Sequence, residues 1–170
     1  MKLFQLKNIV TGFASINFED VDMTAVLKEG KTELLDGRSF SWDKSNGDAI
    51  TDCPFYIGTL PIFDTDKLSD ALANTSVKTA NILVEGRSYT VIAAPHYKGN
   101  AINKQLSEMR CFRSGKIMTI HKYVFNSGLV FPTIFTPEEF VMYTFCDTDM
   151  AQKLLECEFS QLIFEECPIK

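Results

Sequence analysis

The sequence predicts an α+β fold, with an antiparallel, hairpin-rich sheet and a few short helices packed on it. Three observations support this class. β-forming runs are separated by Gly-containing turns, helical periodicity is confined to short segments, and the strands dominate while the helices are segregated. With 170 residues, 45% of them hydrophobic, the chain can bury a core without a disulfide or a metal ion.

The N-terminal part predicts one strand, a short helix and a hairpin. Residues 2–10 are expected to form the strand, and residues 12–30 contain a short helical pattern. Asp36-Gly37 lies between residues 32–35 and residues 39–42, which is a strong hairpin signal. We expect a single domain covering residues 1–170.

A polar, turn-rich segment follows this hairpin. Residues 43–54 contain Asn46-Gly47 and Cys53-Pro54, which disfavour regular structure and predict a surface loop. The loop could also be a boundary inside the domain. Residues 1–53 would then form an N-terminal hairpin unit, and residues 54–170 the main α+β part.

Two more hairpins are predicted in the middle of the chain. The first joins residues 80–85 to residues 88–94 around Gly86-Arg87, and these runs are rich in β-formers. The second joins 108–112 to 116–125. Near the C-terminal end we expect an interior strand at residues 140–145 and a final strand at residues 162–164.

The same short pattern occurs twice. Residues 60–72 and 143–155 each contain an apolar stretch, then Asp-Thr-Asp, and then about two turns of amphipathic helix. Paired carboxylates can hold a divalent cation, but Asp is also a preferred helix N-cap and acidic residues complement the helix dipole. Neither copy has supporting His or Asn residues nearby, so we interpret both as helix starts.

Few other residues suggest catalysis. His121 lies in a strand pattern typical of a satisfied sheet residue, and His96 follows Pro95 in a loop. There is no glycine-rich phosphate loop and no nucleophile motif. The five cysteines contain no C-x-x-C pair, and we expect them to be reduced and mostly buried. We therefore expect no catalytic residue, no metal and no cofactor, and we favour a binding protein over an enzyme.

The charge is unevenly distributed. Residues 76–126 carry eight Lys/Arg and two Glu, whereas the rest carries nine Lys/Arg and twenty Asp/Glu. This acidic balance suits a basic partner and disfavours nucleic acid. No apolar run approaches the ~20 residues of a membrane helix and no signal peptide is recognisable, so we expect a cytoplasmic protein with no membrane partner.

The polar loop is the best candidate for a partner contact. The candidate residues are Trp42, directly before the loop, and Asp43, Asp48 and Asp52 within it. Trp42 fits either a core position or a partner anchor, since Trp is enriched at binding hot spots, and loops on a rigid scaffold often carry binding residues. We therefore predict that these four residues bind the partner.

Three segments share a recognisable order of elements. Residues 60–72 read as an apolar strand and a capped helix, residues 111–125 as a strand with a terminal aromatic residue, and residues 134–164 as a closing strand, a helix and a Leu-x-Phe end. In pattern and order these segments resemble a bacterial family of immunity proteins encoded beside polymorphic toxins, formerly a domain of unknown function with a myxobacterial prototype. Residues 95–105 depart from the pattern because they contain no acidic residue.

The resemblance implies a protein that binds one cognate toxin domain in the cytoplasm and occludes its active site or its substrate access. It implies no cofactor, and the acidic surface suggests a basic toxin. Two alternatives stay open: a metal-dependent phosphate-handling enzyme that uses the Asp-x-Asp segments, and a generic protein-interaction adaptor.

Overall fold

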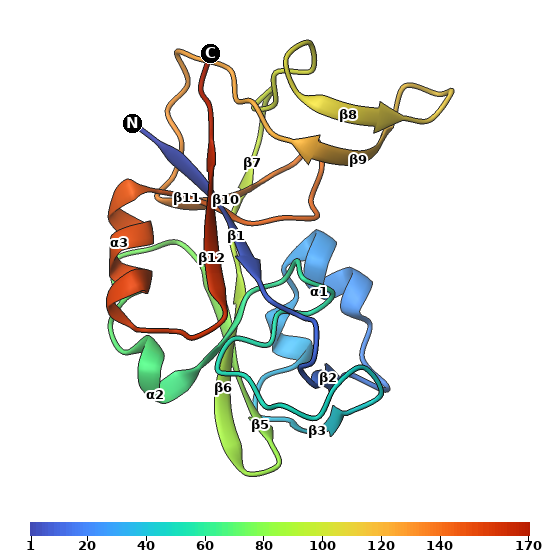
Figure 1. Cartoon of the computed structure of the whole chain (residues 1–170), viewed down its shortest axis with the longest axis vertical. Coiled ribbons are helices and arrows are strands. Elements are labelled where there is room, and N and C mark those ends of the chain that lie inside the picture. Colours follow the sequence, from blue (N-terminus) through green and yellow to red (C-terminus); the bar gives the residue numbers. More distant parts are fainter.

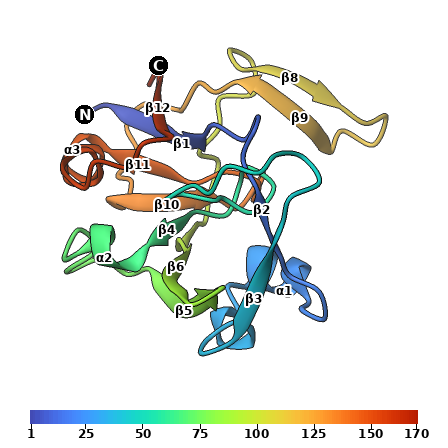
Figure 2. The ribbon, with the colours of Figure 1, turned by 60° about the horizontal axis from the view of Figure 1, so that its bottom comes forward.

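The computed structural model describes residues 1–170 and confirms the α+β class. Twelve strands form two five-stranded sheets and one separate hairpin, and three α-helices and one 3₁₀ helix complete the fold. Figures 1 and 2 show the arrangement of these elements. Seven of the nine strand pairs are antiparallel, as the sequence predicts, and two are parallel.

Sheet I combines the first strand of the chain with strands from its C-terminal part. Its order is β12-β1-β11-β10-β7. The strands are β1 (Leu3–Asn8), β7 (His96–Tyr97), β10 (Ile134–Pro137), β11 (Phe145–Asp147) and β12 (Leu162–Cys167). Because β1 lies between β11 and β12, the N-terminal strand is an interior strand of this sheet.

Sheet II is built from the next part of the chain, in the order β2-β3-β5-β6-β4. The strands are β2 (Ser15–Asn17), β3 (Ser39–Asp43), β4 (Ile62–Asp64), β5 (Lys78–Val84) and β6 (Arg87–Ala93). The predicted hairpin β5–β6 is confirmed, with its turn at Glu85-Gly86, where both residues have positive φ. Residues 1–53 therefore supply strands to both sheets.

The hairpin predicted at Asp36-Gly37 is wrong. Residues on its N-terminal side form the 3₁₀ helix η1 (Thr32–Leu34), which follows helix α1 (Met23–Glu29). The turn docks on β5 instead, because Asn81 N donates to Asp36 Oδ1 (2.8 Å) and Gly37 N donates to Asn81 O (2.8 Å). β3 consequently pairs with β2 and β5.

The two Asp-Thr-Asp segments belong to a unit that the fold builds twice. The first unit is β4, helix α2 (Thr65–Leu68), β5 and β6; the second is β11, helix α3 (Thr148–Glu156), β12 and β1. In both units the last strand lies between the other two. Two cross-strand rows correspond, one of Asp64, Tyr89 and Ile82 and one of Asp147, Leu3 and Cys167.

Individual backbone hydrogen bonds repeat between the units as well. Ile92 N donates to Pro61 O, and at the corresponding place Leu6 N donates to Thr144 O; the donor–acceptor distance is 2.9 Å in both bonds. The units differ in one connection. A two-residue turn joins β5 to β6, whereas the two ends of the sequence lie between β12 and β1 (Figure 1). The second unit is thus a circularly permuted version of the first.

Three hydrophobic cores follow from this duplication. The two units share one core, which contains residues from both sheets together with the buried sides of the two capped helices: Leu6, Cys53, Phe55, Phe63, Leu68, Ile92, Ala94, Ile134, Cys146, Met150, Ala151, Leu154 and Phe159. A second core lies between sheet II and α1, and a third, rich in aromatic residues, lies against sheet I. Neighbouring residues alternate between cores, since Phe63 faces the shared core and Ile62 the second.

Two other predictions near the repeats need correction. Helix α2 has one turn rather than about two, because Ser69 has a positive φ of 47° that ends the helix. The strand predicted at residues 140–145 starts only at Phe145, because Phe140 N donates to Pro137 O in a turn.

The predicted hairpin of residues 108–125 is confirmed as β8 (Glu108–Cys111) and β9 (Ile117–Lys122). None of the helices is long and apolar enough to span a membrane.

Candidate binding site

Both Asp-Thr-Asp segments are helix caps. Asp64 Oδ1 accepts hydrogen bonds from Asp66 N (2.9 Å) and Lys67 N (3.2 Å), and Asp147 Oδ1 accepts one from Met150 N (2.9 Å). These bonds satisfy amide groups that the first turn of a helix leaves unpaired. The sequence interpretation as helix starts is therefore confirmed.

The first cap also belongs to an ion pair. Asp64 is buried, and its Oδ2 accepts from Arg87 Nε (2.7 Å) and contacts Arg87 Nη2. Both carboxylate oxygens of Asp64 are therefore occupied by protein donors. No group of three or more His, Cys, Asp or Glu side chains in the structure is arranged to hold a metal ion.

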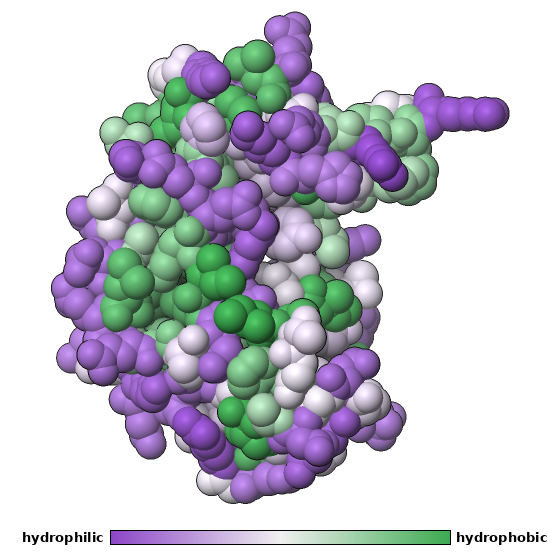
Figure 3. All heavy atoms as spheres, in the orientation of Figure 1, coloured by the Kyte–Doolittle hydropathy of each residue, from purple (hydrophilic) through white to green (hydrophobic).

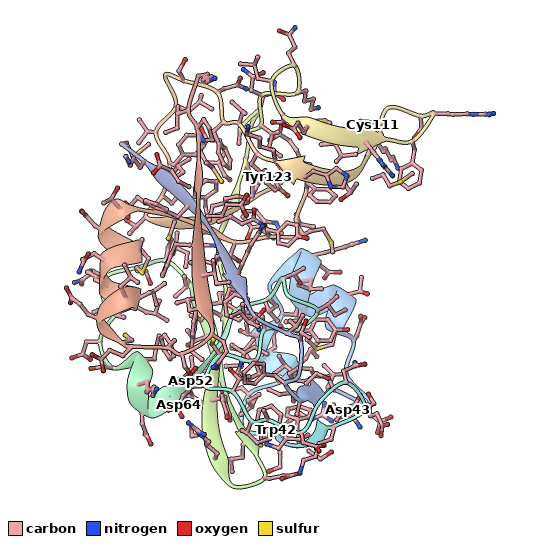
Figure 4. All side chains as sticks on the ribbon, in the orientation of Figure 1. Trp42, Asp43, Asp52, Asp64, Cys111 and Tyr123 are labelled. Atoms are coloured by element: carbon pink, nitrogen blue, oxygen red, sulfur yellow. The ribbon has the colours of Figure 1, made fainter.

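Asp52 lies beside this cap and not in an exposed loop (Figure 4). It is only 5% exposed, and its carboxylate accepts from Lys67 Nζ (2.6 Å), Ser160 N (3.1 Å) and Ser160 Oγ (3.0 Å). Burial disfavours the charged form, but the donors from Lys67 and Ser160 outweigh this effect and lower the pKa of Asp52. Asp52 is therefore buried in contacts within the protein, contrary to the exposed loop expected from the sequence, and its role as a partner contact stays a prediction.

The other predicted contact residues are at least partly exposed. Trp42 is half-buried and packs edge-to-face on Tyr89, with ring centroids 5.6 Å apart. Asp43 and Asp48 are exposed, and Asp43 Oδ1 accepts from Ser45 N (2.9 Å). Figure 4 shows Trp42 and Asp43 on the lower part of the molecule, separated from Asp52 and Asp64. Their role as partner contacts stays a prediction.

The cysteines and histidines are the residues that could supply a nucleophile and a base, and the structure gives their surroundings. All five cysteines are free thiols, and burial raises the pKa of Cys53 and Cys167 to about 12. Such thiols are poor nucleophiles. Cys111 is exposed on β8. His121, expected to be a satisfied sheet residue, is instead exposed on β9.

A cavity of about 800 Å³ lies next to the end of β1. Its lining comes from residues 7–11 and 13–16, from residues 54–58, and from Asn46, Thr51 and Tyr143. Cavities of this size bind ligands or side chains of a partner in many proteins. Asn46 and Thr51 belong to the polar segment that the sequence singles out, so that segment borders the cavity.

Three of the hydrophobic residues that line the cavity are exposed, and we call them the apolar rim. Ile9 and Val10 follow β1, and Ile57 belongs to residues 54–58. Figure 3 shows hydrophobic side chains gathered on this face, where the end of β1 leads into the loop toward β2. The strand pattern of residues 2–10 includes Ile9 and Val10 but assigns them no exposed role.

Ile57 is held in a backbone conformation that does not suit it. Residues 56–59 form a tight turn in which Thr59 N donates to Tyr56 O (2.9 Å), and both central residues, Ile57 and Gly58, have positive φ. Such turns favour Asn-Gly, whereas a β-branched residue is strained there. Ile57 is also 69% exposed. Neither burial nor turn geometry explains an isoleucine at this position.

The chain matches no protein-family model, and no curated protein is significantly similar to it.

Proposed function

We propose that the protein is an immunity protein that binds a cognate bacterial toxin domain in the cytoplasm and occludes its active site. The observation that carries this proposal is the strained, exposed Ile57 on the apolar rim of the cavity. A hydrophobic residue that is both strained and exposed in the free molecule supports a role in a contact. The resemblance of three segments to immunity proteins supplies the identity of the partner.

The rim can anchor a partner without a conformational change. Ile9, Val10 and Ile57 line a cavity that is already present, so an apolar side chain of the toxin would bury their exposed surface when it enters. Buried anchors of this kind dominate the energetics of many interfaces and slow dissociation. The protein would then inhibit by steric occlusion and would need no catalytic group.

The acidic charge of the segment that supplies part of the cavity lining favours a basic toxin. Residues 11–50, which include β2, α1, η1 and β3, carry eight Asp/Glu and four Lys/Arg. Asp43 and Asp48 are exposed at the end of this part, next to the cavity-lining Asn46. Opposite charge on the partner would accelerate association, and added salt would reduce that rate.

The test is capture and rescue with the product of the gene immediately upstream. The protein should bind that product and protect cells that express it. Val10→Asp should weaken binding about tenfold or more, because it places a charge in an apolar contact. Val130→Asp is the matched control, since Val130 is 88% exposed and does not line the cavity.

The two parts of the proposal fail differently. Absence of binding and of protection would contradict toxin neutralisation itself. Binding that Val10→Asp and Val130→Asp leave equally strong would keep the function but contradict the proposed surface. A captured partner that is not a toxin would support the adaptor alternative.

The enzyme alternative makes a separate prediction. Titration with Mg²⁺ or Mn²⁺ should give a calorimetric signal that disappears in Asp64→Asn or Asp147→Asn if the Asp-x-Asp segments hold a metal. The capping bonds of Asp64 and Asp147, and the pairing of Asp64 with Arg87, favour the structural interpretation of these segments.

A further inference from the structure

The hairpin β8–β9 stands out from the body as an arm (Figures 1 and 2). It is a sheet of its own and pairs with neither five-stranded sheet. Met109, Ile117 and Ile120 attach it to the aromatic core beside sheet I. We call residues 108–122 the arm. These three side chains anchor the arm, while its turn and most of its other side chains are exposed.

The arm is cationic on an otherwise acidic molecule. It carries four Lys/Arg and one Glu, a net charge of +3, whereas the rest carries thirteen Lys/Arg and twenty-one Asp/Glu, a net charge of −8. Arg110, Arg113 and Lys116 make no ion pair. Lys122 lies 3.9 Å from Glu108, but both side chains are more than half exposed, so this pair contributes little.

Apolar side chains are exposed among these charges. Phe112, at the turn, is 52% exposed, and Met118 on β9 is similarly open. Arg, Phe and Met are the residue types that protein interfaces enrich. Their combination on a projecting element is typical of a contact surface.

The edges of the arm are poorly suited to pairing with another strand. The ladder between β8 and β9 is irregular at residues 108–109 and again at residues 110–111. Bulges and edge charges hinder the addition of a further strand. A partner would therefore contact the side chains of the arm and would not pair with its backbone.

From these features we infer that the arm docks into an acidic surface of a partner protein that offers an apolar depression for Phe112. Charge complementarity sets the sign of the partner surface, because the three unpaired cations have no acidic neighbour in the chain that neutralises them. A protein surface fits better than nucleic acid. The arm has one exposed aromatic ring, no series of stacking platforms, and the remaining net charge of −8 repels a phosphate chain.

This contact is separate from the proposed toxin site. No residue of the arm lines the cavity, and the charge that each surface selects is opposite. The inference does not depend on toxin neutralisation, and its test uses no toxin.

The experiment measures binding to poly-L-glutamate, an acidic polypeptide, by biolayer interferometry at about 20 mM and about 200 mM salt. The wild-type protein should bind at the lower salt concentration. The double variant Arg113→Glu/Lys116→Glu should bind at least about tenfold more weakly. The matched control Lys28→Glu/Lys44→Glu changes the net charge equally but lies outside the arm, and it should bind like the wild type. Thermal unfolding of each variant verifies that it is folded.

A second readout localises the contact. Cys111 is the one exposed cysteine and lies on the arm, so its alkylation by maleimide should slow when poly-L-glutamate is bound. Unchanged alkylation, absence of binding, or equal weakening in the control variant would overturn the inference. Stronger arm-dependent binding to oligo-dT of about 20 nucleotides, or to phosphatidylglycerol vesicles, would overturn it in favour of a different macromolecule.

Discussion

Asp64 and Asp147 occupy equivalent positions in the two units, but their surroundings differ. Both cap a helix, and only Asp64 also binds the guanidinium of Arg87. The pairing is hidden from the sequence, because Arg87 lies twenty-three residues further along and reaches Asp64 through the β4–β6 pairing. Equivalent residues in a duplicated unit can therefore contribute different amounts to stability.

Replacement of the two caps should separate these contributions. Asp147→Ala should lower the free energy of unfolding by about 1 kcal/mol, the usual effect of losing an N-cap. Asp64→Ala should cost about 2 kcal/mol, because it also leaves Arg87 without its partner. Urea unfolding measures both, and Arg87→Ala in the Asp64→Ala background completes a double-mutant cycle. Equal losses for the two caps would contradict an energetic role for the ion pair.

Asp52 should make the stability depend on pH in the acidic range. Its pKa lies below the ordinary value of 3.8, so its charged form is favoured in the folded protein. The stabilisation is present above about pH 3.8 and is lost as the pH falls through the lower folded-state value. Asp52→Asn should therefore be less stable than the wild type near neutral pH, and the difference should shrink below pH 3.8 in urea titrations. A constant difference would contradict this assignment.

Ile57 should lower the stability of the free protein, in agreement with a role in binding. Ile57→Asn places Asn-Gly in a turn whose two central residues have positive φ, and should raise the free energy of unfolding by about 1 kcal/mol. Gly58→Ala should lower it, since Gly58 has a φ of 67°. Differential scanning calorimetry measures both changes. A lower melting temperature for Ile57→Asn would show that the isoleucine stabilises the free protein.

At the scale of elements, helix α3 shows how well the apolar periodicity of the sequence predicts which residues are buried. The pattern after Asp147 predicts that Ala151, Leu154 and Leu155 share the buried face of α3. Ala151 and Leu154 are buried in the shared core, whereas Leu155 is 55% exposed. Helix α3 contacts one core only, so the stripe of residues that it buries is narrower than the stripe of apolar residues in its sequence.

This difference predicts unequal effects of two adjacent substitutions. Leu154→Ala should destabilise the protein by about 2–5 kcal/mol, because a fully buried leucine leaves a cavity. Leu155→Ala should change the stability by less than about 0.5 kcal/mol. Chemical denaturation of the two variants gives the comparison directly. Similar losses would mean that Leu155 is covered in solution.

At the scale of the whole molecule, the duplicated unit explains how two sheets share one core. Each unit turns one face of its strands toward the shared core and the other toward a core of its own. The permuted connection decides where the ends of the sequence lie. Leu3 pairs with Cys167, so the ends are adjacent at the place where the first unit has its two-residue turn.

A circular permutant should therefore fold. We expect a chain joined from Lys170 to Met1 by a short Gly-Ser linker, and opened at Glu85-Gly86, to unfold cooperatively with near-native circular dichroism. The new opening lies in an exposed turn, where chain breaks are tolerated. A permutant opened between Val91 and Ile92 is the control and should not fold, because both residues are buried in β6. Failure of the first permutant would show that the β5–β6 turn is needed.

The sequence by itself determined the features that depend on neighbouring residues. The hairpins β5–β6 and β8–β9, the two Asp caps and the α+β class follow from turn residues, capping residues and short-range periodicity, which act within a few positions. Trp42, Asp43 and Asp48 could be recognised as surface candidates for the same reason, although Trp42 packs partly on Tyr89.

Only the tertiary structure decided which distant segments meet. It placed β1 between β11 and β12, gave β3 the partners β2 and β5, and buried Asp52 against Lys67 and Ser160. It also exposed Ile57 at the rim of the cavity. Strand pairing and burial depend on which hydrophobic faces pack together over the whole chain, and no local pattern contains that information.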